Sequence, residues 1–214
     1  NTCTGQSGKL DKIHYDALGR IVEHTTNSGT KTITYDDLNR RTSESDWKGN
    51  VTRYEYDDAG NVTKTTYPDG LSEQFAYNAD NQVTSFTDRN GDTVSYEYNS
   101  SHRLSAVTDG RGNKTTYHYD GSGNLTSTVD GEGAKTSYTY DKAGNRLTTT
   151  DARGHVTKYA YDEQGRLVKA TYPDGSTAGY EYTSAGKLVK VTDAAGSVQT
   201  YTVDGNGFNT SQSD

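Results

Sequence analysis

The side chains in this sequence that could do acid–base or metal chemistry are its histidines and its paired carboxylates. The histidines are His14, His24, His102, His118 and His155. No two of them have the spacing by which one strand or helix presents two ligands to a metal ion. The single cysteine, Cys3, can form neither an internal disulfide nor a cysteine-based metal site. We therefore expect surface histidines, a free thiol, no metal and no other cofactor.

Carboxylates occur in pairs such as Asp36–Asp37 and Asp57–Asp58. These pairs recur along the chain, whereas a catalytic acid–base pair would normally occur once. The segment DRNGD at 88–92 resembles the start of a calcium-binding loop, but Thr93 stands where an EF-hand has glycine and Asn99 where it has glutamate. The sequence also contains no phosphate-binding glycine loop and no nucleophile elbow. We predict surface turns at these positions, no catalytic residue, and a protein that is not an enzyme.

The composition favours turn-rich β structure. Apolar residues make up 29% of the 214 residues and the mean hydropathy is -1.01, too polar for a thick aliphatic core. Eighteen tyrosines, 23 glycines and two prolines nevertheless indicate strands and turns rather than disorder. The net charge of -7 argues against nucleic acid and anionic membranes as partners, and no apolar run is long enough to span a membrane. Because the chain contains no methionine, we expect it to be an interior piece of a longer protein.

The chemistry-bearing residues are embedded in a repeat marked by tyrosine. The first interval between marker tyrosines is 20 residues and the following intervals are 21, with Val203 in the tenth register. An isoleucine or an aromatic residue stands two positions before each marker. A fixed period of this length predicts units that pack only against their neighbours. The marker tyrosines, which we expect to be structural, are Tyr15, Tyr35, Tyr56, Tyr77, Tyr98, Tyr119, Tyr140, Tyr161 and Tyr182.

Each repeat predicts two turns, most of them of the form Asp-x-x-Gly, which is typical of a type I turn followed by a bulge. The first turn follows the marker, and its fourth residue is Gly19, Asn39, Gly60, Asn81, His102, Gly123, Gly144, Gly165, Gly186 or Gly207. The second turn precedes the next marker strand and ends at Gly29, Gly49, Gly70, Gly91, Gly112, Gly133, Gly154, Gly175 or Gly196. Glycine, asparagine and histidine tolerate the positive φ that this position needs. Pro68 and Pro173 stand at the turn position where proline is favoured.

The segments between the turns predict strands. Stretches such as NVTRYEY at 50–56 and NLTSTV at 124–129 alternate with period two and place the two aromatic residues of each repeat on one face. The apolar column of the partner strand is interrupted at Arg146, and Leu147 beside it suggests a local shift of register. We predict an all-β fold in which consecutive 21-residue β-hairpin repeats form one long, curled antiparallel sheet.

The segments GRGNKTTYHYDGSGNL at 110–125 and HVTKYAYDEQGRLV at 155–168 resemble the YD repeat of the Rhs family. Its relatives include bacterial Rhs and polymorphic toxins, wall-associated proteins, BC components of toxin complexes, and teneurins. The resemblance implies a YD-repeat array over residues 10–214, truncated at both ends, with residues 1–9 as an N-terminal leader or repeat remnant. It also implies part of a spiral β-shell, which in the toxins encloses a C-terminal toxic domain. The family's self-cleaving region has no match in this chain.

Two functions follow as expectations. In the first, the chain is a non-catalytic segment of a shell that encapsulates and delivers a C-terminal toxin domain, in a bacterial protein that is secreted or displayed at the cell surface. Its partners would then be neighbouring YD repeats of the parent chain and the encapsulated C-terminal polypeptide. In the second, the chain is a carbohydrate-binding or adhesion module whose tyrosine rows, together with Trp47, contact glycans. In either case the terminal strands would expose edges that invite edge-to-edge self-association.

Overall fold

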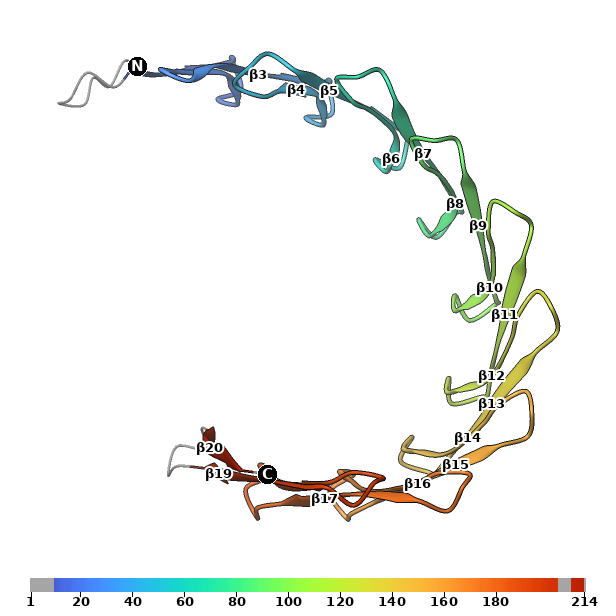
Figure 1. Cartoon of the computed structure of the whole chain (residues 1–214). Helices are drawn as coiled ribbons and strands as arrows, with labels where there is room; N and C mark the ends of the chain where they lie inside the picture. The colour runs from blue at the N-terminus through green and yellow to red at the C-terminus, as the bar shows by residue number, and fades with distance from the viewer. Residues whose placement is uncertain (1–9, 204–208, 214) are drawn as a thin grey trace. The chain divides into compact units, whose positions relative to one another are not determined.

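A computed structural model of the chain describes residues 10–203 and 209–213 (Figure 1). Cys3, residues 1–9 and Gly207 lie outside the described residues. The chain divides into two compact units, residues 1–112 and residues 113–214. Within the described ranges both units consist of strands and turns, and no helix there is long and apolar enough to cross a membrane.

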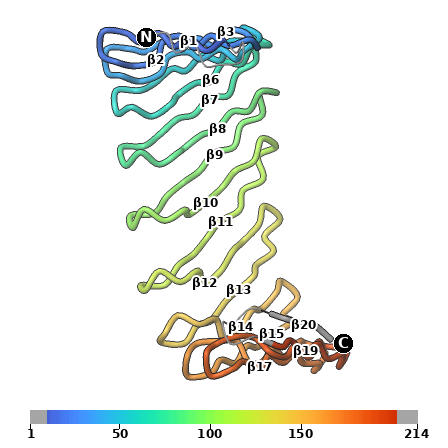
Figure 2. Tube along the Cα trace, turned by 90° about the vertical axis from the view of Figure 1, so that its left-hand side faces the viewer, coloured from blue at the N-terminus to red at the C-terminus, as the bar shows by residue number. Residues whose placement is uncertain are grey.

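Unit 1 is a meander of ten strands, each paired antiparallel with the next along the chain (Figure 2). The strands are β1 (Asp11–Tyr15), β2 (Ile21–Thr26), β3 (Gly29–Tyr35), β4 (Arg41–Ser45), β5 (Val51–Tyr56), β6 (Val62–Thr66), β7 (Ser72–Tyr77), β8 (Val83–Thr87), β9 (Thr93–Tyr98) and β10 (Leu104–Thr108).

Unit 2 continues the same plan with ten strands that again pair in chain order. They are β11 (Lys114–Tyr119), β12 (Leu125–Val129), β13 (Lys135–Tyr140), β14 (Arg146–Thr150), β15 (Val156–Tyr161), β16 (Leu167–Thr171), β17 (Thr177–Tyr182), β18 (Leu188–Thr192), β19 (Val198–Val203) and β20 (Asn209–Ser213). The prediction of an all-β fold built from consecutive antiparallel hairpins is confirmed.

Pairing along the meander alternates between a longer and a shorter ladder. Around the first turn, β5 and β6 align from Arg53 opposite Thr66 to Tyr56 opposite Val62, with a bulge just before Tyr56. Around the second turn, β6 and β7 align only from Lys64 opposite Gln74 to Thr66 opposite Ser72. The beginning of each partner strand therefore extends beyond the shorter ladder.

The turns have the geometry that the Asp-x-x-Gly pattern predicts. In the first turn of the third repeat, the Gly60 amide donates to the Asp57 carbonyl at 3.1 Å, and the Asp57 amide donates to the Asn61 carbonyl at 3.0 Å. Gly60 has φ +92°, and Asn81 and His102 take the same left-handed conformation at +60° and +59° in the following two repeats. The residues that replace glycine in this column are thus those that tolerate positive φ.

One glycine of the repeat has a role of its own, and one suggested register shift is wrong. Gly29 does not close an Asp-x-x-Gly turn, because Asn27 and Ser28 alone connect β2 to β3, and Gly29 pairs with Thr26 at φ +131°. This shorter connection explains the 20-residue first interval. A Cβ atom on Gly29 would lie 1.9 Å from the carbonyl oxygen of Trp47, so the close approach of that backbone requires glycine.

The strand at Arg146 is also not shifted. Arg146 lies opposite Tyr140, in the same register as Val62 opposite Tyr56, and the bulge falls at the same place. Register is therefore set by the turns, and the loss of one apolar side chain from the column does not change it.

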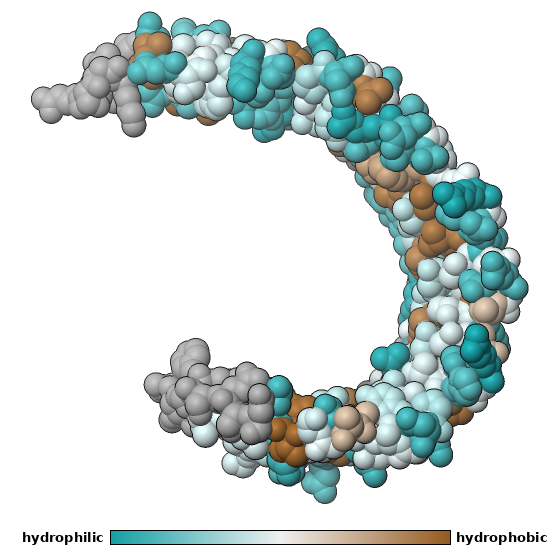
Figure 3. Space-filling model, in the orientation of Figure 1, coloured by the Kyte–Doolittle hydropathy of each residue, from teal (hydrophilic) through white to brown (hydrophobic). Residues whose placement is uncertain are grey.

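The sheet of each unit is a single layer. Among the described residues, strands contact only strands adjacent in the chain. The buried residues there are small: Ser45, Ala106, Ser127, Ala170 and Ala178. The accessible surface of the chain is 14073 Å², against about 9,700 Å² for a compact globular protein of this mass. The exposed surface in Figure 3 is largely hydrophilic, and its hydrophobic patches are small and separate.

Candidate functional site

One face of each unit carries the tyrosine rows. In β5, Tyr54 and Tyr56 are half-buried, whereas the alternating Arg53 and Glu55 on the opposite face are exposed. The same alternation appears in the other marker strands, for example in β15. We call the surface that carries the marker tyrosines, together with the residue two positions before each marker, the tyrosine face. Because no second layer covers this face, these rings remain partly accessible.

Most marker tyrosines are pinned to the backbone of the preceding strand by their hydroxyl groups. Each of these hydroxyls donates to the carbonyl of the first residue of that strand, over 2.7–3.1 Å. The pairs are Tyr35 with Ile21, Tyr56 with Arg41, Tyr77 with Val62, Tyr98 with Val83, Tyr140 with Leu125, Tyr161 with Arg146 and Tyr182 with Leu167. Tyr119 ends β11 opposite Leu125, and Tyr15, in β1, is 53% exposed.

The short ladder explains why these hydroxyls are needed. Pairing between β4 and β5 ends at Ser43 opposite Arg53, so the Arg41 carbonyl lies beyond the last backbone pair. Tyr56, three residues further along β5, supplies a donor to that carbonyl at 2.7 Å. A backbone carbonyl that is left without a hydrogen-bond partner on folding costs free energy, and the phenol supplies that partner. Burial raises the pKa of the Tyr56 hydroxyl, which keeps the donor protonated.

The second aromatic row differs from the marker row. Within the described residues, the hydroxyls of Tyr54, Tyr96, Tyr138 and Tyr159 make no hydrogen bond, although their rings are half-buried like those of the markers. Phe75 occupies the same row and packs against Phe86 with ring centroids 4.9 Å apart. This row therefore contributes ring packing, and its hydroxyls remain available.

Aspartate side chains hold the first turns from within. Asp57 accepts the Asn61 amide N–H through Oδ1 at 2.8 Å, and it accepts the Asn61 side-chain amide through Oδ2 at 3.0 Å. The side-chain hydrogen bond from the asparagine is the main cause that lowers the pKa of Asp57, and the corresponding bonds lower the pKa of Asp120 and Asp141. The recurring carboxylates are thus turn caps, and Asp88 caps the DRNGD turn in the same way through Asn90 and Asp92.

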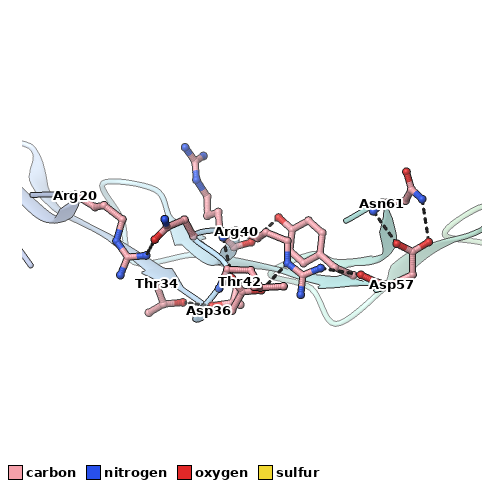
Figure 4. Close-up of polar contacts among 11 residues, drawn as sticks. Arg20, Thr34, Asp36, Arg40, Thr42, Asp57 and Asn61 are labelled. Atoms are coloured by element: carbon pink, nitrogen blue, oxygen red, sulfur yellow. Dashed lines mark hydrogen bonds and ion pairs between the residues drawn. The ribbon is translucent and has the colours of Figure 1, made fainter. Parts of the chain in front are cut away.

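Arginine side chains link one first turn to the next (Figure 4). Arg40 donates from Nε to Asp36 in its own turn at 2.7 Å and from a terminal nitrogen to the Asp57 carbonyl in the next turn, also at 2.7 Å. Its guanidinium carbon lies 4.8 Å from the ring centroid of Tyr56, the next marker. Arg166 makes the equivalent contacts in its repeat, and Arg20 makes them with the side-chain oxygen of Asn39 as its acceptor in the next turn. One side chain therefore joins a turn, its successor and a tyrosine ring.

Histidines lie beside single carboxylates. His102 contacts Asp80 in the preceding turn at 2.9 Å, His155 contacts Asp151 at 2.9 Å, and His24 contacts Asp11 at 2.7 Å. Across the ranges that the structure describes, no three histidine, cysteine, aspartate or glutamate side chains gather closely enough to hold a metal ion. These contacts serve local structure.

Trp47 lies in a turn, but its side chain is half-buried and not fully exposed. Its half-buried ring meets His24 edge-on, with centroids 4.9 Å apart. Beside it lies a cavity of about 390 Å³ on the tyrosine face of unit 1. The cavity is lined by Lys31, Glu44, Ser45, Asp46, Trp47, Asn50, Thr52, Tyr54 and Pro68.

The repeated hairpin with a tyrosine pinned across the short ladder agrees with a known family. The Teneurin YD-shell family matches residues 12–199. The chain belongs to this family. The resemblance inferred from the YD motifs is confirmed, and the chain is a segment of a YD-repeat shell. A search of curated proteins found no match.

Solved structures share the YD-shell fold at low sequence identity. The crystal structure of TcdB2-TccC3 matches with a TM-score of 0.69 and 19% identity, over 91% of this chain and 13% of the other. The Tc holotoxin pore of Photorhabdus luminescens, with a mutated TccC3, matches with a TM-score of 0.59 and 15% identity, over 95% of this chain and 15% of the other. TcdB2-TccC3-Cdc42 matches with a TM-score of 0.52 and 17% identity, over 95% and 14%. The chain thus spans a small fraction of the length of these relatives.

Sequence reasoning found the tyrosine and glycine columns but missed the contacts that connect repeats. The acceptors of the tyrosine hydroxyls lie 14 or 15 residues earlier in the chain. The residue after the turn glycine provides the link between turns, and it is arginine or asparagine in most repeats, as at Arg40 and Asn61. That polar column is the signal that could have revealed the link.

Proposed function

We propose that this chain is a non-catalytic stretch of wall in a shell that encloses a polypeptide located C-terminal to it in the parent protein. The observation that carries the proposal is the single-layer meander of nearly identical hairpins. Each strand contacts only its neighbours in the chain, so the same unit can be repeated to cover any area. A container needs area, and these contacts supply it without a unique site.

The contacts between repeats suit a wall. The tyrosine hydroxyl bonds and the arginine links recur from one hairpin to the next, so that sliding one hairpin along another would break several bonds together. By analogy with the Tc toxin components of similar fold, we place the parent protein in a bacterium, secreted or at the cell surface, with a toxin domain as cargo.

Protease protection tests this function. The parent protein is prepared with an epitope tag in the polypeptide that follows residue 214 and is treated with a broad-specificity protease under native conditions. Enclosure predicts that the tagged segment survives and becomes sensitive when the repeats are unfolded with denaturant. The matched control carries the same tag on the same downstream segment expressed without the repeats, and it should be cut at once. Rapid loss of the tag from a parent protein whose repeats remain intact would rule out a container.

The row of unbonded tyrosine hydroxyls supports a second candidate, glycan binding at the tyrosine face. Rings with free hydroxyls, such as those of Tyr96 and Tyr138, present both an apolar surface and a hydrogen-bonding group to a sugar. A glycan array would then show saturable binding that is lost when Tyr96 and Tyr138 are changed to alanine. Unchanged binding in that variant, or none in the original chain, would reject this candidate.

A further inference from the structure

The cavity beside Trp47 combines three ring side chains that occur together at this one place in the sequence. Trp47 and Pro68 occupy the same position of successive second turns, and Tyr54 lies in the strand between them. The corresponding second-turn positions in later repeats are Arg89, Gly110, Gly131, Ala152, Pro173 and Ala194. The other proline, Pro173, therefore has alanine on either side of it in this column. The site is specific to this part of unit 1.

The Trp47 ring is held in position before any ligand arrives. His24 meets it at an interplanar angle of 74°, and the backbone carbonyl of Trp47 lies directly against Gly29. A ring that is already fixed loses little conformational freedom on binding.

The charged groups of the cavity are already satisfied. Glu44 forms ion pairs with both Lys31 and Arg41, and the hydrogen bond from Lys31 is the main cause that lowers the pKa of Glu44. Asp46 accepts the backbone N–H groups of Lys48 and Asn50. A charged ligand would have to compete with these pairs, so the cavity suits an uncharged one.

Two of the rings that line the cavity carry hydrogen-bond donors. Within the described residues, neither the indole N–H of Trp47 nor the hydroxyl of Tyr54 has a hydrogen-bond partner, and both rings are half-buried. The carboxylate acceptors nearby are occupied. A complementary ligand offers acceptors to these two donors, and it has a rigid apolar surface to place against the rings.

We propose that this cavity binds a proline-containing, uncharged, extended segment of another polypeptide. Proline lacks an N–H donor, keeps its carbonyl acceptor and presents a rigid apolar ring. Successive prolines preform an extended helix whose carbonyls point outward and which docks on aromatic-lined surfaces. A cavity on a single-layer sheet has no lid with which to enclose a free small molecule, whereas a longer peptide is held at several points along its length.

Trp47 is the only tryptophan, so its emission reports on this site alone. The full chain is titrated with a decaproline peptide while tryptophan fluorescence is followed. We expect a saturable change that a glycine–serine peptide of equal length does not produce. Tyr54→Phe, which removes only the hydroxyl, should weaken binding about two- to tenfold, and Pro68→Ala should also weaken it. By calorimetry, Trp47→Ala should lose binding by tenfold or more.

Matched controls come from the repeats without tryptophan. Tyr159→Phe and Pro173→Ala alter the equivalent positions five repeats further along, and both should leave decaproline affinity unchanged. The proposal is overturned if the chain shows no saturable response to decaproline or responds equally to the glycine–serine peptide. It is also overturned if the control variants lose as much affinity as Tyr54→Phe, or if a neutral disaccharide saturates the site and decaproline does not.

Discussion

The bond from a marker tyrosine to the preceding strand can be tested in β9, where a bonded and an unbonded tyrosine lie two residues apart. Tyr98 donates to the Val83 carbonyl at 2.8 Å, whereas Tyr96 makes no hydrogen bond among the described residues. Both rings are half-buried and lie on the same face. Tyr98→Phe removes one oxygen and leaves the Val83 carbonyl without that donor. Tyr96→Phe removes the same atom and breaks nothing.

The expected difference follows from the position of the acceptor. The ladder between β8 and β9 ends at Ser85 opposite Ser95, so Val83 lies beyond it. Loss of a neutral hydrogen bond costs about 0.5–1.5 kcal/mol, and a partly buried acceptor left unsatisfied brings the total to about 1–2 kcal/mol. Tyr96→Phe should change the free energy of unfolding by less than about 0.5 kcal/mol. In a unit of roughly 100 residues, each 1 kcal/mol corresponds to a fall in Tm of about 4–8 °C.

Denaturant unfolding followed by circular dichroism gives the free energies, and amide hydrogen exchange locates the effect. In Tyr98→Phe, exchange should accelerate in β8 and β9 and remain unchanged in β1 and β2, because stability in a repeat array is carried by contacts between neighbours. Equal destabilisation by the two substitutions would refute the idea that the hydroxyl replaces the missing ladder bond. The ring alone would then account for the conserved spacing of the tyrosines in this chain.

Three further predictions concern the turns. Gly29→Ala should destabilise unit 1 by more than about 2 kcal/mol, because the new Cβ would meet the Trp47 carbonyl at 1.9 Å. Gly49→Ala has nothing within 4 Å of the new Cβ, so it should cost only the strain of the left-handed conformation, about 1–2 kcal/mol. Equal losses of unfolding free energy in denaturant would contradict the close approach at Gly29. Arg166→Ala should lower the free energy of unfolding by about 1–2 kcal/mol, because it breaks hydrogen bonds to Asp162 and to the Thr183 carbonyl. Arg153→Ala, at an exposed turn position, should lower it by less than about 0.5 kcal/mol. An unchanged free energy of unfolding in Arg166→Ala would count against the link between turns. The folded-state pKa values of Asp57, Asp120 and Asp141 are lowered from 3.8, so their contribution to stability is present above that pH and is lost as the pH falls below it. Replacing the three by asparagine should therefore flatten the dependence of unfolding free energy on pH between about pH 6 and about pH 2.5. An unchanged slope would show that these turn caps do not cause the loss of stability in acid.

The sequence determined the repeat because its signals are local. Tyrosine at a fixed interval, alternation with period two, and glycine or asparagine at a position that needs positive φ each act within a few residues, as in the hairpin from Tyr56 to Val62. These signals were sufficient for the strands, the turns and the family. They failed at Gly29, where glycine matched the column but served a close approach to Trp47, and at Arg146, where an apolar gap did not move the register.

The tertiary structure decided what each side chain contacts in the neighbouring repeat. The Tyr98 hydroxyl reaches a carbonyl 15 residues earlier, and Arg40 reaches a carbonyl 17 residues later. Trp47 and Pro68 line the same cavity because they occupy successive second turns. Such contacts depend on how one hairpin is placed against the next, and a periodic sequence constrains that placement only weakly, because neighbouring repeats present similar side chains to one another. The period therefore determines where the strands and turns of each hairpin lie. The packing between hairpins determines which groups the tyrosines, the arginines and the single tryptophan contact.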